Sequence, residues 1–258
     1  MRSESSNSNV QRVAFLFAME VEGRAFATQL GLVDEGRLDP DLPASWLSGE
    51  WRNEEGHSIR LAAGFAGADE VEGCDCIGTN AATLVSYLLC RRFQPDLLVN
   101  AGTCGGFHDR GAKVGDVHLG SGAYLFHDRR IPLAAFEGYG IGRIPALPVE
   151  DLCRVLGAKP GVVSSGDSFT TNTDEIEFFA RENVVAKEME AAAIARVARD
   201  LGVPFLTVKA VTDLVDHPEK QSSEMFEQNL QMVTRDLGDR LVRLVEWLSE
   251  GHQIADFG

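Results

Sequence analysis

Three acidic side chains, Glu22, Glu190 and Asp213, each follow an apolar stretch that predicts a buried β-strand. One acidic residue at a helix start more often complements the helix dipole than catalyses a reaction. Three of them converge, however, because ligands of open α/β sheets bind at the carboxyl ends of the strands. The six histidines do not group at metal-ligand spacing. The pattern therefore favours acid–base chemistry on a polyhydroxylated substrate over metal catalysis.

Five further residues stand at predicted strand ends and are candidates for substrate binding: Thr103, Phe169, Glu188, Met189 and Thr212. Thr103 lies in AGTCGGF, whose glycines could bring backbone N–H groups to a ligand. The segment lacks the GxGxxG pattern of a dinucleotide loop and is not followed by an apolar helical period. It reads equally as a ligand-binding loop or as an ordinary strand turn.

The elements that must position these residues alternate along the chain. Apolar or alternating runs predict strands at residues 13–19, 58–65, 96–102, 115–126, 161–165, 184–188 and 205–212. Spacings of three and four predict helices at residues 21–30, 77–93, 191–201 and 226–248. Residues 31–57 show no clear periodicity. The alternation predicts an α/β fold with a largely parallel sheet flanked by helices.

Length and charge restrict the classes of function. A length of 258 residues without a linker predicts a single domain over residues 11–258, preceded by a disordered polar tail, 1–10. Lys and Arg number 24 against 39 Asp and Glu, and the net charge of −15 disfavours binding to nucleic acids and anionic membranes. The five scattered cysteines suit a reducing compartment, and no apolar run is long enough to cross a bilayer. We therefore expect a cytoplasmic protein.

Two other motifs disfavour a zinc site and a serine hydrolase, and a third can be interpreted in more than one way. Cys74-x-Cys76 has no second pair, which disfavours a zinc site. The serines near Gly166 lack the G-x-S-x-G pattern of a serine hydrolase. The charged run that begins at His127 reads as a solvated surface or, with the apolar residues that extend to Tyr139, as the wall of a pocket or an interface.

Six motifs in order along the chain resemble the 5′-methylthioadenosine/S-adenosylhomocysteine nucleosidases of the nucleoside phosphorylase superfamily. They are AMEVE at 18–22, NAGTCGGF at 100–107, FHDRRIP at 126–132, SGDSF at 165–169, EMEAAA at 188–193 and KAVTDLVD at 209–216. FHDRRIP and KAVTDLVD are most similar to the plant-type branch. The resemblance covers residues 13–248. It implies a single α/β domain with a central mixed sheet, no metal and no organic cofactor.

The resemblance also implies a reaction. The family hydrolyses the N-glycosidic bond of 5′-methylthioadenosine, in some members also of S-adenosylhomocysteine, and releases adenine and a thioribose in methionine salvage. By similarity, Glu22 would deprotonate the attacking water and Asp213 would protonate adenine N7. Glu190 would hold the ribose hydroxyls. The family works as a homodimer, so a neighbouring subunit would complete the pocket with the segment 127–139.

The substrate-binding roles also follow from the resemblance. Met189 would lie beneath the sugar, Phe169 would stack on adenine, and Thr103 would border the ribose and the water, while Thr212 precedes the catalytic acid. Whether Glu188 contacts the substrate or only supports the structure stays open.

Some features depart from the family pattern, and two rival functions remain. Residues 64–73, GFAGADEVEG, are longer and more acidic than expected, which leaves the choice between methylthioadenosine and S-adenosylhomocysteine open. Residues 31–57 match weakly, and Lys209 stands where many bacterial relatives have arginine. A nucleoside phosphorylase is disfavoured because Glu20 and Glu22 would repel phosphate. A non-catalytic storage relative is disfavoured because all three acidic positions are filled.

Overall fold

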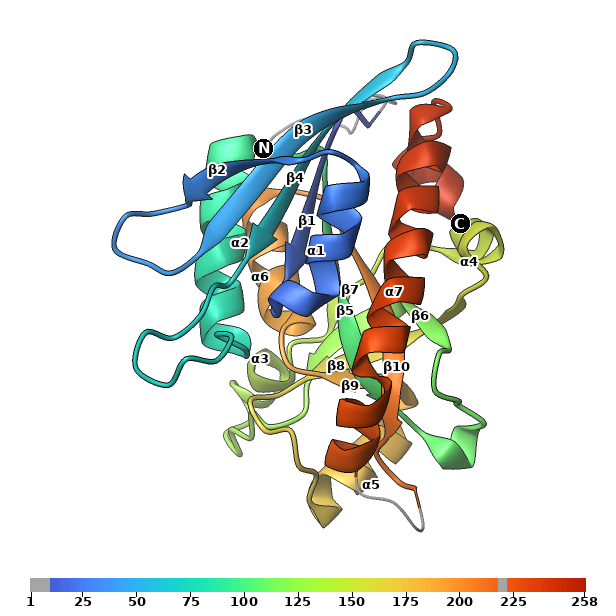
Figure 1. Ribbon diagram of the computed structural model, residues 1–258. Helices are drawn as coiled ribbons and strands as arrows, with labels where there is room; N and C mark the ends of the chain where they lie inside the picture. Colours follow the sequence, from blue (N-terminus) through green and yellow to red (C-terminus); the bar gives the residue numbers. More distant parts are fainter. Residues whose placement is uncertain (1–9, 218–221) are drawn as a thin grey trace.

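A ten-stranded sheet forms the centre of the computed structural model, which describes residues 10–217 and 222–258 (Figure 1). The strands are β1 Arg12–Phe17, β2 Val33–Arg37, β3 Ser45–Arg52, β4 Ser58–Phe65, β5 Leu97–Gly106, β6 Val117–Phe126, β7 Ile144–Pro145, β8 Lys159–Ser165, β9 Val184–Glu188 and β10 Phe205–Leu214. The helices are α1 Glu20–Gln29, α2 Thr79–Phe93, α3 Glu137–Ile141, α4 Glu150–Leu156, α5 Thr173–Glu182, α6 Ala191–Leu201 and α7 Ser222–Ser249.

The sheet is mixed, as expected. Strands β4, β1, β5 and β10 are parallel neighbours, and so are β6, β8 and β9. Antiparallel pairs join β10 to β6 and β9 to β5, so that β5, β10, β6, β8 and β9 close into a ring. Strands β3 and β2 extend the open side in antiparallel fashion. The parallel arrangement is therefore confined to two runs of strands.

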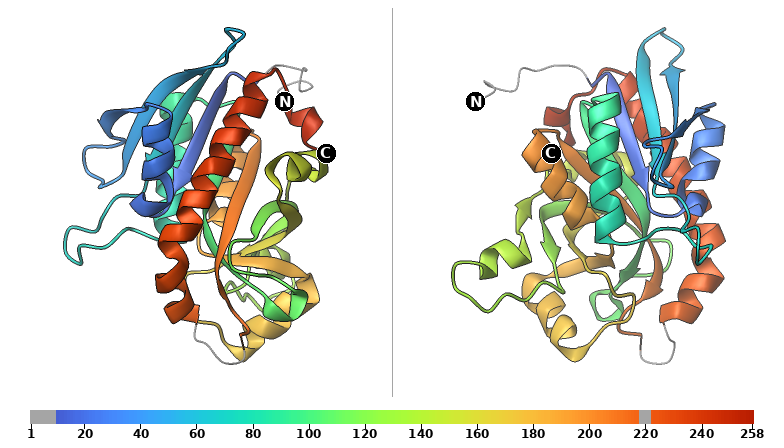
Figure 2. Two further views of the ribbon diagram at one scale, coloured as in Figure 1. Left: turned by 45° about the vertical axis from the view of Figure 1, so that its right-hand side comes forward. Right: turned by 90° about the vertical axis from the view of Figure 1, so that its left-hand side faces the viewer.

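Helices cover both faces of the sheet. The long helix α7 packs against α1, β5 and β10, whereas α2 and α6 pack together on the opposite face (Figures 1 and 2). Phe15, Phe26 and Leu237 belong to the core on the α1 and α7 side. The start of α6 is fully buried because its alanines are small enough to lie close to the sheet.

Several elements differ from the sequence predictions. The strands 58–65 and 184–188 and the helix 191–201 have the predicted bounds. Strands β2 and β3 lie in the segment 31–57, where the sequence pattern predicts no strand, and α3, α4 and α5 are not predicted either. AGTCGGF is neither a loop nor a turn, because β5 continues through Thr103 to Gly106.

The predicted tail, 1–10, lies outside the described residues apart from Val10, whose side chain is buried in the core. Within the residues that the structure describes, we find no helix with the length and apolarity required to cross a membrane.

Candidate active site

The carboxyl ends of β1, β5, β9 and β10 meet around one cavity of about 160 Å³. Its wall includes all eight residues that the sequence pattern marks as catalytic or substrate-binding: Glu22, Thr103, Phe169, Glu188, Met189, Glu190, Thr212 and Asp213. Ala18, Met19, Ile77, Val215 and Phe226 add apolar surface. The structure thus brings together side chains that lie far apart in the sequence.

Glu22 lies in the first turn of α1, directly after β1. Its carboxylate accepts hydrogen bonds from the backbone N–H of Met19 at 3.1 Å, the N–H of Thr103 at 2.7 Å and the Thr103 hydroxyl at 2.9 Å. Burial raises the pKa of Glu22, although the charge of Lys209 and these hydrogen bonds oppose the shift. A Cβ on Gly102 would lie 2.8 Å from Glu22 Oε1, so only glycine admits the carboxylate here.

Glu188, the first acidic residue of the EME motif, lines the cavity and also holds the start of α6. Its oxygens accept hydrogen bonds from the Ser165 hydroxyl and from the N–H groups of Glu190 and Ala191, which are the first N–H groups of α6. Lys209 Nζ lies 2.8 Å from Glu188 Oε2. Burial alone would raise the pKa of Glu188, but the Lys209 charge and the hydrogen bonds together hold it below its ordinary value. Glu188 therefore caps α6 as an anion.

Glu190 has a different environment. Its Oε1 accepts a hydrogen bond from the Gly78 N–H at 2.9 Å, and its Oε2 lies 4.0 Å from Lys209 Nζ. Burial raises the pKa of Glu190 to about 7; the Lys209 charge opposes this shift and the Glu188 charge adds to it. Lys209 itself is 1% exposed, and the three nearby glutamates raise its pKa against the effect of burial. The buried ammonium of Lys209 thus interacts electrostatically with the three buried carboxyl groups of Glu188, Glu190 and Glu22.

Asp213 occupies an irregular position in β10. The pairing of β10 with β5 shifts its register between Val211 and Asp213, and such a bulge changes the direction of a side chain. The Thr212 hydroxyl donates a hydrogen bond to Asp213 Oδ1 at 3.0 Å. Burial raises the pKa of Asp213, against the hydrogen bonds from Thr212 and Ser222 and the charge of Lys187. A Cβ on Gly105 would lie 3.1 Å from Asp213 Oδ2.

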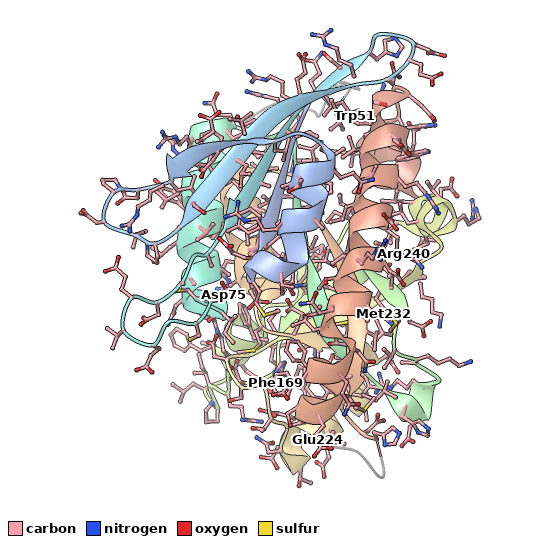
Figure 3. All side chains as sticks on the ribbon, in the orientation of Figure 1. Trp51, Asp75, Phe169, Glu224, Met232 and Arg240 are labelled. Carbon is pink, nitrogen blue, oxygen red and sulfur yellow. The ribbon has the colours of Figure 1, made fainter. Side chains whose placement is uncertain are left out.

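Phe169 forms an aromatic wall of the cavity. It lies on the loop between β8 and α5, beside the half of α7 that carries Glu224 (Figure 3). Its ring meets that of Phe226 edge-on, with centroids 5.6 Å apart and an interplanar angle of 73°. The ring is 39% exposed, so a flat aromatic ligand has access to it.

Two residues of this region do not emerge from the sequence pattern, and Asp167 of the SGDSF motif makes a contact that the motif does not indicate. Lys187 lines the cavity from β9, and Gly78 supplies a backbone donor to Glu190. Asp167 accepts hydrogen bonds from the N–H and the hydroxyl of Thr79, both at 2.6 Å, and so caps α2 from the Phe169 loop. The motif SGDSF can be recognised in the sequence, but its residue types do not indicate that Asp167 contacts the start of α2, almost ninety residues earlier in the chain.

The arrangement provides separate groups for the two ends of a polar bond. Asp213 has a raised pKa and can carry a proton, whereas Glu190 and Glu22 can face a developing positive charge and a nucleophile. In the described residues, no three or more His, Cys, Asp or Glu side chains form a group that could hold a metal ion.

Known proteins are similar to this chain in both sequence and fold. A family model described as the phosphorylase superfamily matches residues 47–246. The chain is 35% identical over 249 residues to 5′-methylthioadenosine nucleosidase of Arabidopsis thaliana, covering 96% of this chain and 90% of the relative. It is 33% identical over 240 residues to 5′-methylthioadenosine/S-adenosylhomocysteine nucleosidase of the same plant, covering 93% and 92%.

Solved structures of such nucleosidases have a similar fold. The apo form of Arabidopsis thaliana 5′-methylthioadenosine nucleosidase superposes with a TM-score of 0.89 at 34% identity, covering 96% of this chain and 100% of that chain. The 5′-methylthioadenosine/S-adenosylhomocysteine nucleosidase of Colwellia psychrerythraea, in complex with adenine, superposes with a TM-score of 0.71 at 26% identity, covering 93% and 96%.

Proposed function

The chain belongs to the 5′-methylthioadenosine/S-adenosylhomocysteine nucleosidases of the phosphorylase superfamily, and from this we propose that Asp213, Glu190 and Glu22 carry out its hydrolysis of the N-glycosidic bond. The observation that carries the assignment of roles is the meeting of these three buried carboxyl groups at one cavity with an aromatic wall. The products are adenine and a thioribose.

Asp213 acts at the adenine end of the bond. Adenine is a poor leaving group as an anion, so protonation of N7 while the bond breaks lowers the barrier, and such proton transfer contributes about 10²- to 10⁴-fold. The raised pKa of Asp213 favours the protonated donor. Because Thr212 donates to Oδ1, the proton is best placed on Oδ2. Phe169 stacks on the purine and holds N7 toward this oxygen.

Glu190 and Glu22 act at the sugar end. Positive charge develops on the ribose as the bond breaks, and a fixed carboxylate in a dry site stabilises it more than water does. Glu190 accepts hydrogen bonds from the ribose hydroxyls, and Met189 supports the apolar face of the ring. Glu22 accepts the proton of the attacking water, since its raised pKa makes it a better base near neutral pH than an exposed glutamate. Thr103 fixes the orientation of that carboxylate.

Phosphorolysis is not favoured by this site. Lys187 is the lysine that lines the cavity, and its ammonium already donates to three backbone carbonyls. Lys209 is engaged by Glu188. Neither the Lys187 ammonium on the cavity wall nor the Lys209 ammonium behind it is therefore available to a phosphate ion.

Product analysis tests the function. Purified protein is incubated with methylthioadenosine, S-adenosylhomocysteine, adenosine or inosine, each with and without phosphate, and the products are separated by chromatography. We expect adenine and a reducing thioribose from methylthioadenosine at a rate independent of phosphate. A phosphate-dependent rate with a sugar 1-phosphate as product would identify a phosphorylase, and adenine binding without turnover would identify a storage protein.

A homodimer is the second part of the proposal. The segment 127–139 carries three large apolar side chains that are well exposed: Leu133 at 60%, Phe136 at 52% and Tyr139 at 64%. The region around α3 projects from the body of the molecule beside α2 (Figure 2, right). Exposed apolar side chains clustered in this way are typical of contact surfaces, and this segment is not part of the cavity wall of its own chain.

Sedimentation tests this part. We expect the wild-type protein to sediment as a dimer, and a Leu133→Asp variant to dissociate and to bind substrate more weakly. Val33→Asp is the matched control, because Val33 is 66% exposed on β2 at the other side of the sheet. A fully active wild-type monomer would contradict the dimer.

A further inference from the structure

Lys187 is a buried cation that the roles described above do not use. It lies on β9, is 6% exposed and pairs in register with Gly105 of β5. Within the described part of the chain, none of the ion pairs includes Lys187. The charges of Glu175 and Asp213 raise the pKa of Lys187, against the larger effect of burial. A buried ammonium without a carboxylate partner is costly unless other groups solvate it.

Backbone carbonyls solvate this ammonium. Lys187 Nζ donates to the carbonyl oxygens of Ser168 at 2.9 Å, Phe169, and Thr170 at 3.4 Å. An ammonium has three N–H donors, so these three successive carbonyls use all of them. Nζ also lies 5.7 Å from the centroid of the Phe169 ring. The lysine therefore binds the backbone on both sides of the aromatic residue.

The loop that it binds is exposed to solvent. Ser168, Phe169 and Thr170 are all exposed, and they lie between the end of β8 and the start of α5. An exposed loop of this kind samples many conformations unless it is tied to a rigid element. Lys187 extends from a strand of the central sheet, so it fixes the loop to the same sheet that carries Asp213.

We propose that Lys187 is a positioning residue for purine binding, which holds the Phe169 loop so that the ring lies over the base while the base faces Asp213. This inference rests on the proposed function, because it takes the Phe169 wall to be the adenine site. The inferred effect of Lys187 on binding passes through Phe169. The charge of Lys187 is the smallest of the named effects on the pKa of Asp213, so its direct effect on turnover should be small.

The expected effect is on binding more than on turnover. In Lys187→Met, the side chain keeps a similar length but loses its charge and donors, so the loop is released. We expect KM for methylthioadenosine and the dissociation constant of adenine to rise about tenfold, the size expected for partial loss of a stacking platform. The value of kcat should change less than threefold. Lys187→Arg keeps the cation and its donors and should restore most of the binding.

A double-mutant cycle distinguishes positioning from general support. If Lys187 acts through Phe169, the methionine substitution should raise KM much less in a Phe169→Ala background than in the wild type. Lys159→Met is the matched control, since Lys159 is an exposed lysine that pairs with Asp116 at 2.7 Å. It should leave KM and adenine binding unchanged.

KM and adenine binding are compared only between variants that are shown to be folded. Wild-type adenine release is measured first, and its absence would count against the proposed function. If the wild type is active, two results would overturn the inference. One is a KM of the Lys187→Met enzyme within threefold of the wild-type value. The other is an increase in KM caused by Lys187→Met that is the same in the Phe169→Ala background as in the wild type. If Lys187→Met melts below the assay temperature, Lys187→Gln, which keeps two donors without the charge, replaces it under the same criteria.

Discussion

Replacement of Lys209 by methionine should destabilise the protein strongly and in a pH-dependent way. Lys209 Nζ is 2.8 Å from Glu188 Oε2 and 4.0 Å from Glu190 Oε2, and the side chain is 1% exposed. Removing one partner of a buried ion pair leaves an uncompensated charge, which costs about 3–5 kcal/mol. For a chain of this length, that corresponds to a fall in melting temperature of roughly 10 °C.

The sign of the pH dependence follows from Glu188. Its pKa is lowered in the folded protein, because Lys209 and the hydrogen bonds outweigh burial. A lowered carboxyl pKa contributes stability above the unfolded pKa and loses it as the pH falls through the folded pKa. Without Lys209, burial raises the pKa of Glu188 and further raises that of Glu190, so both carboxyls are neutral in mild acid. The destabilisation should therefore be large near about pH 8 and smaller near about pH 5.

Urea denaturation at both pH values measures this difference. Lys209→Arg keeps the cation and should lose much less stability than the methionine variant. Lys159→Met should cost at most about 1 kcal/mol at either pH, because the Lys159 side chain is 56% exposed and surface pairs contribute little. A methionine variant of position 209 with the same loss at both pH values would refute the electrostatic reasoning and indicate a packing effect alone.

Two other perturbations act on the catalytic carboxyls. Asp213→Asn and Glu22→Gln should each lower the rate of adenine release by about 10²- to 10⁴-fold while the protein stays folded at the assay temperature, and near-wild-type turnover in either would remove the assigned mechanism. Gly105→Ala should lower kcat by about tenfold or more, because its Cβ would lie 2.7 Å from Val215 Cγ2 and 3.1 Å from Asp213 Oδ2. Gly238→Ala on α7 is its control, since a Cβ there meets only Phe26, at 3.9 Å or more; equal kcat in the two variants would contradict the steric argument.

The central strands and the meeting of the carboxylates are predictable from the sequence because both depend on local patterns. Each carboxylate follows an apolar strand, and strand ends converge in any α/β sheet. Strand β2 cannot be found in this way, because all of its residues are exposed. Strand β3 buries the adjacent Trp46 and Leu47, so it shows no regular alternation. Helix α5, in contrast, begins with a capping box of Asn172 and Glu175, a signal that is visible in the sequence and could have located the helix.

The glycines of β5 suggest a loop or a turn in the sequence, and the prediction is wrong for a physical reason. Glycines in a row usually indicate a turn. Here they remain in the strand and lack side chains because Glu22 approaches Gly102, Asp213 approaches Gly105 and Val211 approaches Gly106. Similarly, Lys187 reads as an ordinary strand residue, because its partners are backbone carbonyls of a loop whose path no local pattern specifies.

Catalysis requires opposite protonation states of Glu190 and Asp213, yet in the free protein burial raises the pKa of both. The substrate itself can separate them. Ribose hydroxyls that donate to Glu190 favour its anion and lower its pKa from about 7, whereas purine N7, a hydrogen-bond acceptor, favours protonated Asp213 and raises its pKa further.

The two kinetic profiles should therefore differ in width. The pH dependence of kcat/KM reports the free enzyme, and that of kcat reports the enzyme–substrate complex. We expect kcat/KM to fall below about pH 7 as Glu190 takes up a proton, and the kcat profile to extend further on both the acid and the alkaline side. Initial rates with methylthioadenosine across the pH range measure both. Coincident profiles would mean that substrate contacts do not set these protonation states, and the assignment of Glu190 to the hydroxyls and of Asp213 to N7 would then lose its electrostatic basis.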